Sequence, residues 1–373
     1  MTKPYVLMVK TAGSVCNMHC DYCYYIDKGH EHFMDTDVLE KMIRDYFSSY
    51  SGPVYSFVWH GGEPTLLGLD FYRKAVSLQK KYLPKGTVCW NNLQTNGTLL
   101  DEEWCSFLSE ENFDVGISID GTKAIHERYR HGGNYKDIVK HIRMLQTYRK
   151  QPDLLCALTE DAAQNALDTY HALRDLNTGW IQFIPVINNK DEIASKASLK
   201  AETYGRFLVT VFEEWIRNDI DHLGVQFFME LLNVLSGGQV SLCYMSKTCG
   251  RALIIENDGS VYSCDHFVDE EHRLGTLQKD HLADMIESKE QLSFGQRKYS
   301  DLSQKCKACP YLQLCYGECP KDRHDGQYEL CEGLLYFYEH EIDKLMKIVS
   351  LLKNKKTFTE VKGYFKDGKN DSE

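Results

Sequence analysis

The chain has 373 residues, of which 43% are hydrophobic and 26% are charged, as in ordinary globular proteins. Its 43 Lys and Arg against 54 Asp and Glu give a net charge of −11, which argues against nucleic acid as the main partner. No apolar run approaches the roughly 20 residues that span a bilayer. The first apolar run is broken by Lys10 and carries no cleavage site, so we expect a cytoplasmic protein without membrane attachment.

Short apolar runs and amphipathic segments alternate at intervals of about 30 residues, which predicts βαβ units and a closed or partly closed parallel sheet. The expected strands cover residues 5–10, 54–59, 88–93, 113–119, 154–158 and 180–184. The expected helices between them cover residues 35–50, 101–111, 137–149 and 162–176. Two further helices, at 204–218 and 225–235, are expected to connect this region to the rest of the chain.

Polar or glycine-rich sequence follows most of the expected strands. Cysteines follow the first, HGGEP (60–64) the second, QTNG (94–97) the third, and PVI (185–187) the sixth. In a β/α barrel, the loops at the carboxyl ends of the strands build the active site. We therefore expect these segments to form one site.

Fourteen cysteines in a chain without a signal peptide indicate metal ligands rather than disulfides. Three lie within residues 16–23 and eight within 243–331, which predicts two metal-binding regions. We expect a barrel domain at 1–235, with connecting helices at 191–235, then a small metal-organised domain at 236–350. The lysine-rich segment 351–373 is expected to be a flexible tail.

The first cluster, Cys16, Cys20 and Cys23, has the spacing C-x3-C-x2-C. A zinc site needs four ligands, and only nearby histidines could supply the fourth. Three thiolates can instead hold a [4Fe–4S] cluster that keeps one iron open.

With Tyr22 as its aromatic residue, this cluster resembles the C-x3-C-x-aromatic-C motif of radical S-adenosylmethionine (SAM) enzymes, and HGGEP resembles their GGE motif. The resemblance implies a partial (β/α)6 radical SAM barrel. It also implies SAM contacts from Tyr22, Gly62, Glu63, Ser118, Arg130 and Ile187. An ordinary turn at HGGEP, and packing or surface roles for Ser118, Arg130 and Ile187, are the alternatives.

The later cysteines, with G-x4-C followed by C-x2-C-x5-C-x3-C and a lone cysteine, resemble the SPASM extension of radical SAM enzymes. Eight cysteines suffice for two fully ligated [4Fe–4S] clusters. The resemblance assigns one auxiliary cluster to Cys243, Cys249, Cys264 and Cys319, and the other to Cys306, Cys309, Cys315 and Cys331. Spacing alone does not reveal this pairing, and a zinc ribbon is the alternative. The remaining three, Cys89, Cys105 and Cys156, are expected to be buried apolar side chains.

Segments such as NNLQTNGTLLDEEW, YSCDHFVDEEHRLGTL and LCYGECPKDR extend the resemblance to anaerobic sulfatase-maturating enzymes over nearly the whole chain. It implies oxidation of a Cys or Ser in a C/S-x-A/P-x-R motif of a sulfatase to Cα-formylglycine, with flavodoxin or ferredoxin as electron donor. A 5′-deoxyadenosyl radical takes hydrogen from Cβ, after which a proton and an electron must leave. Asp265 matches the family's catalytic aspartate beside an auxiliary cluster, and His266 is the rival base.

Three roles stay open on sequence grounds. Gln94 and Asn96 either bind the backbone of an extended peptide or close a turn, and His60 is expected to pack beside the site.

A SPASM peptide maturase that forms thioether or carbon–carbon crosslinks is the alternative enzyme. The 15 residues before Cys16 disfavour its leader-binding subclass. A non-catalytic iron–sulfur or zinc protein is the second alternative.

Overall fold

The computed structural model describes residues 3–25, 29, 32–187 and 196–366. The chain divides into two compact units. The first unit comprises Met1–Ser118, Arg130–Pro152 and Thr248–Arg297, and the second comprises Ile119–Tyr129, Asp153–Lys247 and Lys298–Glu373.

Seven neighbouring strands of the main sheet, in the order β12-β11-β10-β1-β3-β4-β5, form the centre of the first unit. Its strands are β1 (Val6–Lys10), β3 (Val54–His60), β4 (Val88–Thr95), β5 (Asp114–Ser118), β10 (Ala252–Glu256), β11 (Ser260–Tyr262) and β12 (Arg273–Thr276). The neighbours from β10 through β1, β3 and β4 to β5 pair in parallel, whereas β11 and β12 continue the sheet as antiparallel strands. Strands from the cysteine-rich half of the sequence therefore complete the N-terminal sheet.

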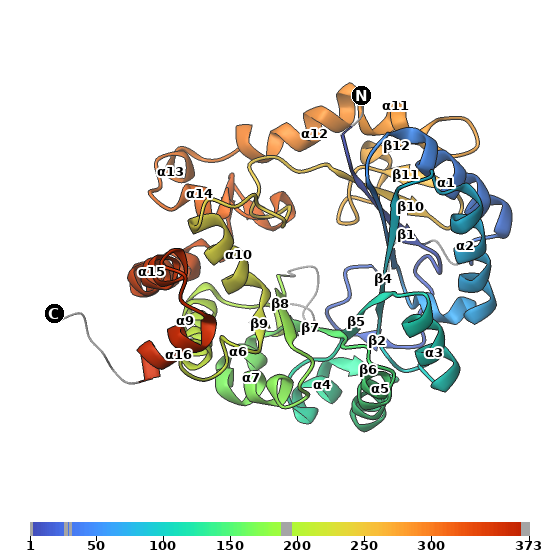
Figure 1. Cartoon of the computed structure of the whole chain (residues 1–373). Helices are drawn as coiled ribbons and strands as arrows, with labels where there is room; N and C mark the ends of the chain where they lie inside the picture. Colours follow the sequence, from blue (N-terminus) through green and yellow to red (C-terminus); the bar gives the residue numbers. More distant parts are fainter. Residues whose placement is uncertain (1–2, 26–28, 30–31, 188–195, 367–373) are drawn as a thin grey trace. The chain divides into compact units, whose positions relative to one another are not determined.

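Helices α1, α2 and α3 lie along one face of this sheet (Figure 1). The helical segments that lie wholly or largely in the first unit are α1 (Thr36–Ser49), η2 (Pro64–Leu67), α2 (Leu69–Tyr82), α3 (Glu102–Glu110), α5 (Tyr135–Thr147), η3 (Glu270–His272), α11 (Leu282–Ile286) and α12 (Lys289–Ser300). The carboxylate of Asp35 caps the N-terminus of α1, accepting hydrogen bonds from the amides of Asp37 and Val38. Helix α2 was not predicted from the sequence, although its buried face repeats with helical period.

The second unit contains the parallel strands β7, β8 and β9 and most of the remaining helices. Its elements are α4 (Lys123–Tyr129), β7 (Asp153–Leu158), α6 (Glu160–Gln164), α7 (Ala166–Arg174), β8 (Trp180–Pro185), α9 (Ala201–Asn218), β9 (Gly224–Val225), α10 (Gln226–Leu235), α13 (Gln304–Lys307), α14 (Leu312–Cys315), η4 (Pro320–Asp322), β13 (Arg323–His324), β14 (Gln327–Tyr328), α15 (Cys331–Lys353) and α16 (Phe358–Lys366). Helices α9 and α15 approach closely at two glycines, since a Cβ on Gly205 would lie 2.9 Å from the Gly333 carbonyl oxygen.

All six predicted strands are confirmed, each to within about two residues at its ends. The predicted helix at 162–176 is divided at Asn165 into α6 and α7, and the side chain of Thr159 caps the start of α6. These differences leave the predicted alternation of strands and helices intact.

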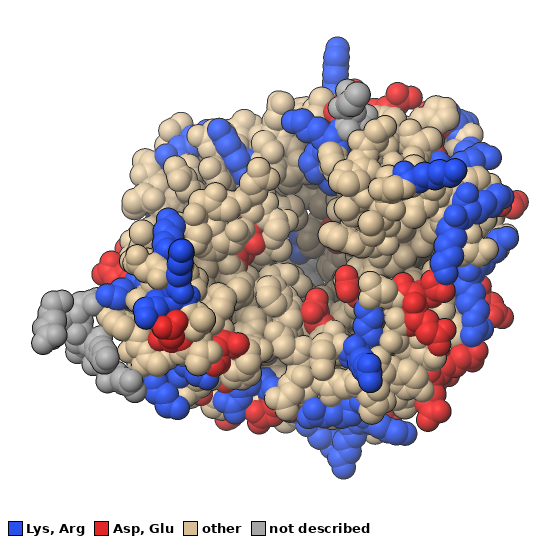
Figure 2. All heavy atoms as spheres, in the orientation of Figure 1, with Lys and Arg blue, Asp and Glu red and all other residues tan. Residues whose placement is uncertain are grey.

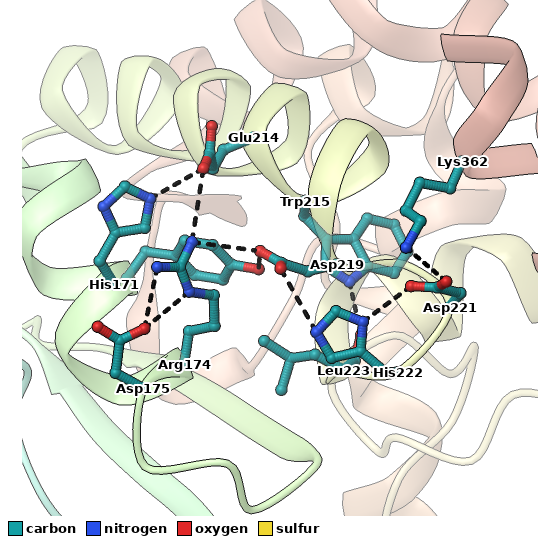
Figure 3. A network of polar contacts seen from close by, with 11 residues as sticks. His171, Arg174, Asp175, Glu214, Trp215, Asp219, Asp221, His222, Leu223 and Lys362 are labelled. Atoms are coloured by element: carbon teal, nitrogen blue, oxygen red, sulfur yellow. Dashed lines mark hydrogen bonds and ion pairs between the residues drawn. The ribbon is translucent and has the colours of Figure 1, made fainter. Parts of the chain in front are cut away.

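Part of the predicted flexible tail is folded. Residues 358–366 form α16, whose Val361 is fully buried, and Lys362 makes an ion pair of 2.6 Å with Asp221 (Figure 3). The lysine-rich composition of this segment gave no indication of an apolar helix face. This face packs on α9. The predicted tail beyond residue 366 lies outside the described residues.

Within the described residues, no helix is both long and apolar enough to cross a membrane. On the face seen in Figure 2, Lys and Arg side chains lie among Asp and Glu side chains. Side chains of both charges are therefore present on this face.

Candidate functional site

The first three cysteines lie in the loop that follows β1. Within this loop the amide of Cys23 donates to the carbonyl of Cys20 at 3.0 Å. The Sγ atom of Cys16 faces two donors, the Met18 amide at 3.4 Å and Asn96 Nδ2 at 3.7 Å. Burial raises the pKa of the Cys16 thiol, while these two donors act to lower it. Donors directed at this sulfur favour a thiolate and so fit a cluster ligand.

The HGGEP segment runs directly beside the cysteine loop. The Gly62 amide donates to the Gly13 carbonyl at 2.7 Å, and the Glu63 amide donates to the Val15 carbonyl at 2.8 Å. A Cβ on Gly62 would lie only 2.0 Å from the Val15 oxygen. Glycine is therefore required here because two backbones approach each other without room for a side chain.

The Glu63 carboxylate is fully buried and joins HGGEP to QTNG. Its Oε1 accepts hydrogen bonds from the Thr65 amide (3.0 Å), the Thr65 hydroxyl (2.5 Å) and the Thr95 hydroxyl (2.7 Å). Its Oε2 accepts from the Asn96 amide at 2.7 Å. Burial raises the pKa of Glu63 despite these bonds. Since these partners engage both oxygens, the backbone of this segment is the better candidate for a contact with SAM.

The Asn96 side chain is buried and engaged at both ends. Its Oδ1 accepts hydrogen bonds from the amide and hydroxyl of Thr98, at 2.9 and 2.7 Å. Its Nδ2 donates to Asn17 Oδ1 at 2.8 Å, in addition to the sulfur contact above. These bonds favour a role in holding the cysteine loop rather than the predicted contact with substrate. The predicted partner Gln94 is half-buried and lies on the face of β4 opposite to that of Thr95.

Two of the predicted SAM contacts meet at the cysteine loop. The short strands β2 (His19–Cys20) and β6 (Arg130–His131) pair here, with Cys20 opposite Arg130. The guanidinium of Arg130 lies 5.6 Å from the centre of the Tyr22 ring. Ser118 ends β5 in the same unit, whereas Ile187 follows β8 in the second unit. The contacts of these residues with SAM stay predictions.

Asp265 lies between a tyrosine and a cysteine. The Tyr24 hydroxyl donates to Oδ2 at 2.9 Å, and the Cys264 Sγ lies 3.5 Å from Oδ1. Burial raises the pKa of Asp265, but the charges of His266 and Lys10 and the hydrogen bond from Tyr24 act against it and hold the pKa well below its usual range. The side chain is therefore a carboxylate at neutral pH.

Four of the later cysteines surround one apolar pocket in the second unit. The pocket is lined by Cys306, Cys309, Cys315 and Cys331 and by apolar or aromatic side chains that include Tyr311, Tyr328, Leu334 and Tyr338. Burial raises the pKa of Cys315 to about 12 and that of Cys331 to about 11. Among the described residues, no three His, Cys, Asp or Glu side chains converge as a single zinc ion would require. The four thiols and the apolar side chains around them match the donor set that the predicted [4Fe–4S] cluster needs, and their joint ligation stays a prediction.

Arg323, to which the sequence analysis gave no role, holds the loop between Cys315 and Cys319. Tyr316, Gly317 and Glu318 all adopt positive φ, at 43°, 69° and 53°. The guanidinium donates to the carbonyls of all three and of Lys298, at 2.6 to 2.8 Å. The Gly317 amide consequently faces Cys315 Sγ at 3.3 Å. One arginine thus stabilises a backbone that is otherwise unfavourable.

The four cysteines predicted for the other auxiliary cluster are divided between the units. Cys249 and Cys264 belong to the first unit, and Cys243 and Cys319 to the second. Their joint ligation of one cluster stays a prediction.

Two family models match the chain. The radical SAM superfamily matches residues 11–159, and the SPASM iron–sulfur cluster-binding domain matches residues 248–310. The serine-type anaerobic sulfatase-maturating enzyme of Bacteroides thetaiotaomicron is 35% identical, over 98% of this chain and 96% of that protein. The chain belongs to the anaerobic sulfatase-maturating enzymes.

Both types of this family are among the relatives. The cysteine-type anaerobic sulfatase-maturating enzyme of Clostridium perfringens is 32% identical, over 94% of this chain and all of that protein. A solved structure of native anSMEcpe with bound AdoMet and the Kp18Cys peptide has a TM-score of 0.87 at 31% identity, over 93% of this chain and 99% of that one. SuiB of Streptococcus suis, with a TM-score of 0.65 at 14% identity, shares the fold alone.

Membership of the anaerobic sulfatase-maturating family confirms the predicted fold class, a radical SAM barrel with a SPASM domain, and the predicted enzyme class. The crosslinking maturase and the non-catalytic metal protein are therefore set aside. The boundaries predicted for the domains stay predictions, since the two compact units follow spatial contacts and interleave along the sequence.

Proposed function

We propose that this sulfatase-maturating enzyme oxidises a Cys or Ser residue of a sulfatase peptide to Cα-formylglycine, with Asp265 as the base. The observation that carries the proposal is the position of Asp265. Its carboxylate accepts a hydrogen bond from Tyr24, the residue that follows the cluster cysteine Cys23. A base is thereby fixed in the same unit as the cysteine loop and the HGGEP segment.

The cysteines hold the cofactors. Cys16, Cys20 and Cys23 would hold the [4Fe–4S] cluster that binds SAM, with Tyr22, Gly62, Glu63, Ser118, Arg130 and Ile187 as the predicted SAM contacts. The two auxiliary [4Fe–4S] clusters would use the two sets of four cysteines predicted above. When bound, these groups supply a 5′-deoxyadenosyl radical that takes hydrogen from Cβ of the target, and an acceptor for the electron that the substrate then loses.

The chain itself must remove a proton from the thiol or hydroxyl of the target. Asp265 is ionised at neutral pH because the charges of His266 and Lys10 and the hydrogen bond from Tyr24 outweigh the effect of burial on its pKa. A radical on Cβ acidifies the adjacent thiol or hydroxyl, so even a weakly basic carboxylate can accept the proton. His266, whose ring lies 5.1 Å from that of Tyr24, is the alternative base.

The other partners follow from the same chemistry. The peptide would be presented in an extended form, with Gln94 as the remaining candidate for contact with its backbone. A flavodoxin or ferredoxin would supply the electron for SAM cleavage. We place the enzyme in the cytoplasm, without a membrane or nucleic-acid partner, because its cysteines need a reducing compartment.

The test uses reconstituted enzyme, reductant, SAM and two sulfatase-motif peptides that differ only in Cys or Ser at the target position. The Cys peptide should lose about 18 Da and the Ser peptide about 2 Da on conversion to formylglycine. Asp265→Asn should retain SAM cleavage and lose most aldehyde, whereas His266→Gln should retain both. Full aldehyde formation by Asp265→Asn would remove this residue from the mechanism. If neither peptide changes mass with the wild-type enzyme while SAM is cleaved, the proposed activity is wrong.

A further inference from the structure

One of the buried charged groups that the proposed mechanism leaves unused lies at the end of β1. Lys10, the last residue of β1, is fully buried, which is rare for a lysine unless it has partners. Its Nζ lies 2.7 Å from Nδ1 of His60. The same ammonium lies 4.5 Å from the ring centre of Tyr25 and 5.9 Å from that of Tyr24.

Each of the two tyrosines that flank Lys10 donates a hydrogen bond to a carboxylate. Tyr24 donates to Asp265 at 2.9 Å, and Tyr25 donates to Glu256 at 2.5 Å. Glu256 is also fully buried and lies opposite Lys10 in the parallel pair β1–β10. The Lys10 amine thus lies beside both tyrosine–carboxylate pairs. Burial lowers the pKa of Lys10, whereas the charges of Asp265 and Glu256 act to raise it and favour the ammonium form. All of these residues belong to the first unit.

The contact of Lys10 with His60 also determines the state of that imidazole. When Lys10 is protonated its ammonium group has donors only, so Nδ1 of His60 accepts and the proton of the neutral ring resides on Nε2. Lys10 and His60 are directly opposite each other on β1 and β3, and His60 is the residue that begins HGGEP. Burial and the charge of Lys10 lower the pKa of His60 to about 3, in agreement with a neutral ring. His60 therefore has a fixed tautomer.

We propose that Lys10 is a positioning residue for the oxidation step: it orders Tyr24 and His60, and through Tyr24 it holds the Asp265 carboxylate in its working orientation. This inference rests on the proposed function. Lys10 itself is fully buried, so it acts through its neighbours rather than on the substrate. Its loss should leave hydrogen abstraction intact and impair the later removal of a proton and an electron from the substrate radical.

The test compares aldehyde formation with SAM cleavage in Lys10→Met. This substitution keeps a similar side-chain length and removes the amine. The ratio of aldehyde to 5′-deoxyadenosine should fall about 10- to 100-fold relative to wild type, as for a misplaced catalytic group. Tyr24→Phe should lower the same ratio, and the double variant should be no worse than the more affected single variant, because both remove the same interaction. Tyr46→Phe is the matched control. Its buried hydroxyl donates to the Tyr5 carbonyl and not to Asp265, and its ratio should stay at the wild-type value.

Three further measurements distinguish this positioning role from a purely structural one. Iron content and melting temperature report whether Lys10→Met folds and assembles its clusters. An anaerobic crystal structure of Lys10→Met should show the distance from Tyr24 Oη to Asp265 Oδ2 lengthened beyond the 2.9 Å seen here. An unchanged distance with an unchanged product ratio would overturn the inference, and so would a fall of aldehyde and 5′-deoxyadenosine in equal proportion. Failure of the wild-type enzyme to form aldehyde would instead refute the proposed function.

Discussion

Substitution of Gly62 by alanine tests whether the SAM cluster requires the close backbone contact between HGGEP and the cysteine loop. The added Cβ would lie 2.0 Å from the Val15 oxygen, 2.5 Å from the Val15 carbonyl carbon and 2.8 Å from the Ser14 carbonyl carbon. All of these are backbone atoms, so no side-chain rotation can relieve the overlap. Since ordinary contacts begin near 3.4 Å, one of the two backbones must move by more than about 1 Å. The displaced carbonyl immediately precedes Cys16.

Two measurements report this displacement. Three [4Fe–4S] clusters hold about 12 iron atoms, so loss of the SAM cluster alone should leave about 8 per chain. SAM cleavage should fall at least about 100-fold even where the cluster is inserted, because a misplacement of about 1 Å has effects of that size. Iron and sulfide analysis measures the first quantity, and 5′-deoxyadenosine formation with excess reductant measures the second.

Gly363→Ala is the matched control, because a Cβ at this position in α16 meets no atom within 4 Å. It should keep the full iron content and SAM cleavage, and it should stabilise the helix by about 0.5–1 kcal/mol. Wild-type iron content and SAM cleavage in Gly62→Ala would refute the reasoning, since the loop would then tolerate the overlap without effect.

Two further predictions concern hydrogen bonding to the cluster loop and the docking of α16. Asn96→Leu removes the Nδ2 donor at Cys16 Sγ, and because such donors stabilise the reduced state, the midpoint potential of the SAM cluster should become more negative in an EPR-monitored redox titration. An unchanged potential would contradict this role. Val361→Ala should destabilise the docked α16 by about 1–3 kcal/mol, whereas Lys362→Met should cost less than about 1 kcal/mol because its ion pair is partly exposed. Hydrogen exchange of the α16 amides measures both, and equal effects would argue against burial of Val361 as the main contribution.

The six strands were predictable because their apolar runs are local and are bounded by turn sequences. The pairing of β10 with β1 was not, because Val6 and Ala252 become neighbours only in the folded chain and no local pattern reports it. Residues 252–256 lie in the predicted second domain, and that boundary stays a prediction. Helix α16 was missed because its surface lysines dominate the composition of the tail.

The candidate site shows the same division between local and long-range information. Its cysteines and HGGEP were found from spacing. Glu63 and Asn96 were assigned to ligands from their motifs, although their hydrogen bonds are made largely with each other and with adjacent loops. A buried carboxylate must be fully hydrogen-bonded, and those partners are visible only in the structure. Lys10 was noted only as a break in an apolar run, because burial of a lysine has no sequence signature.

The most direct test of the account uses a sulfatase-motif peptide in which deuterium replaces both hydrogens on Cβ of the target residue. With reductant and SAM, the 5′-deoxyadenosine formed by the enzyme should contain one deuterium, and the same peptide molecules should become the aldehyde. The result that would contradict the account is 5′-deoxyadenosine without deuterium from an otherwise active enzyme, because the radical would then not take its hydrogen from Cβ of the target.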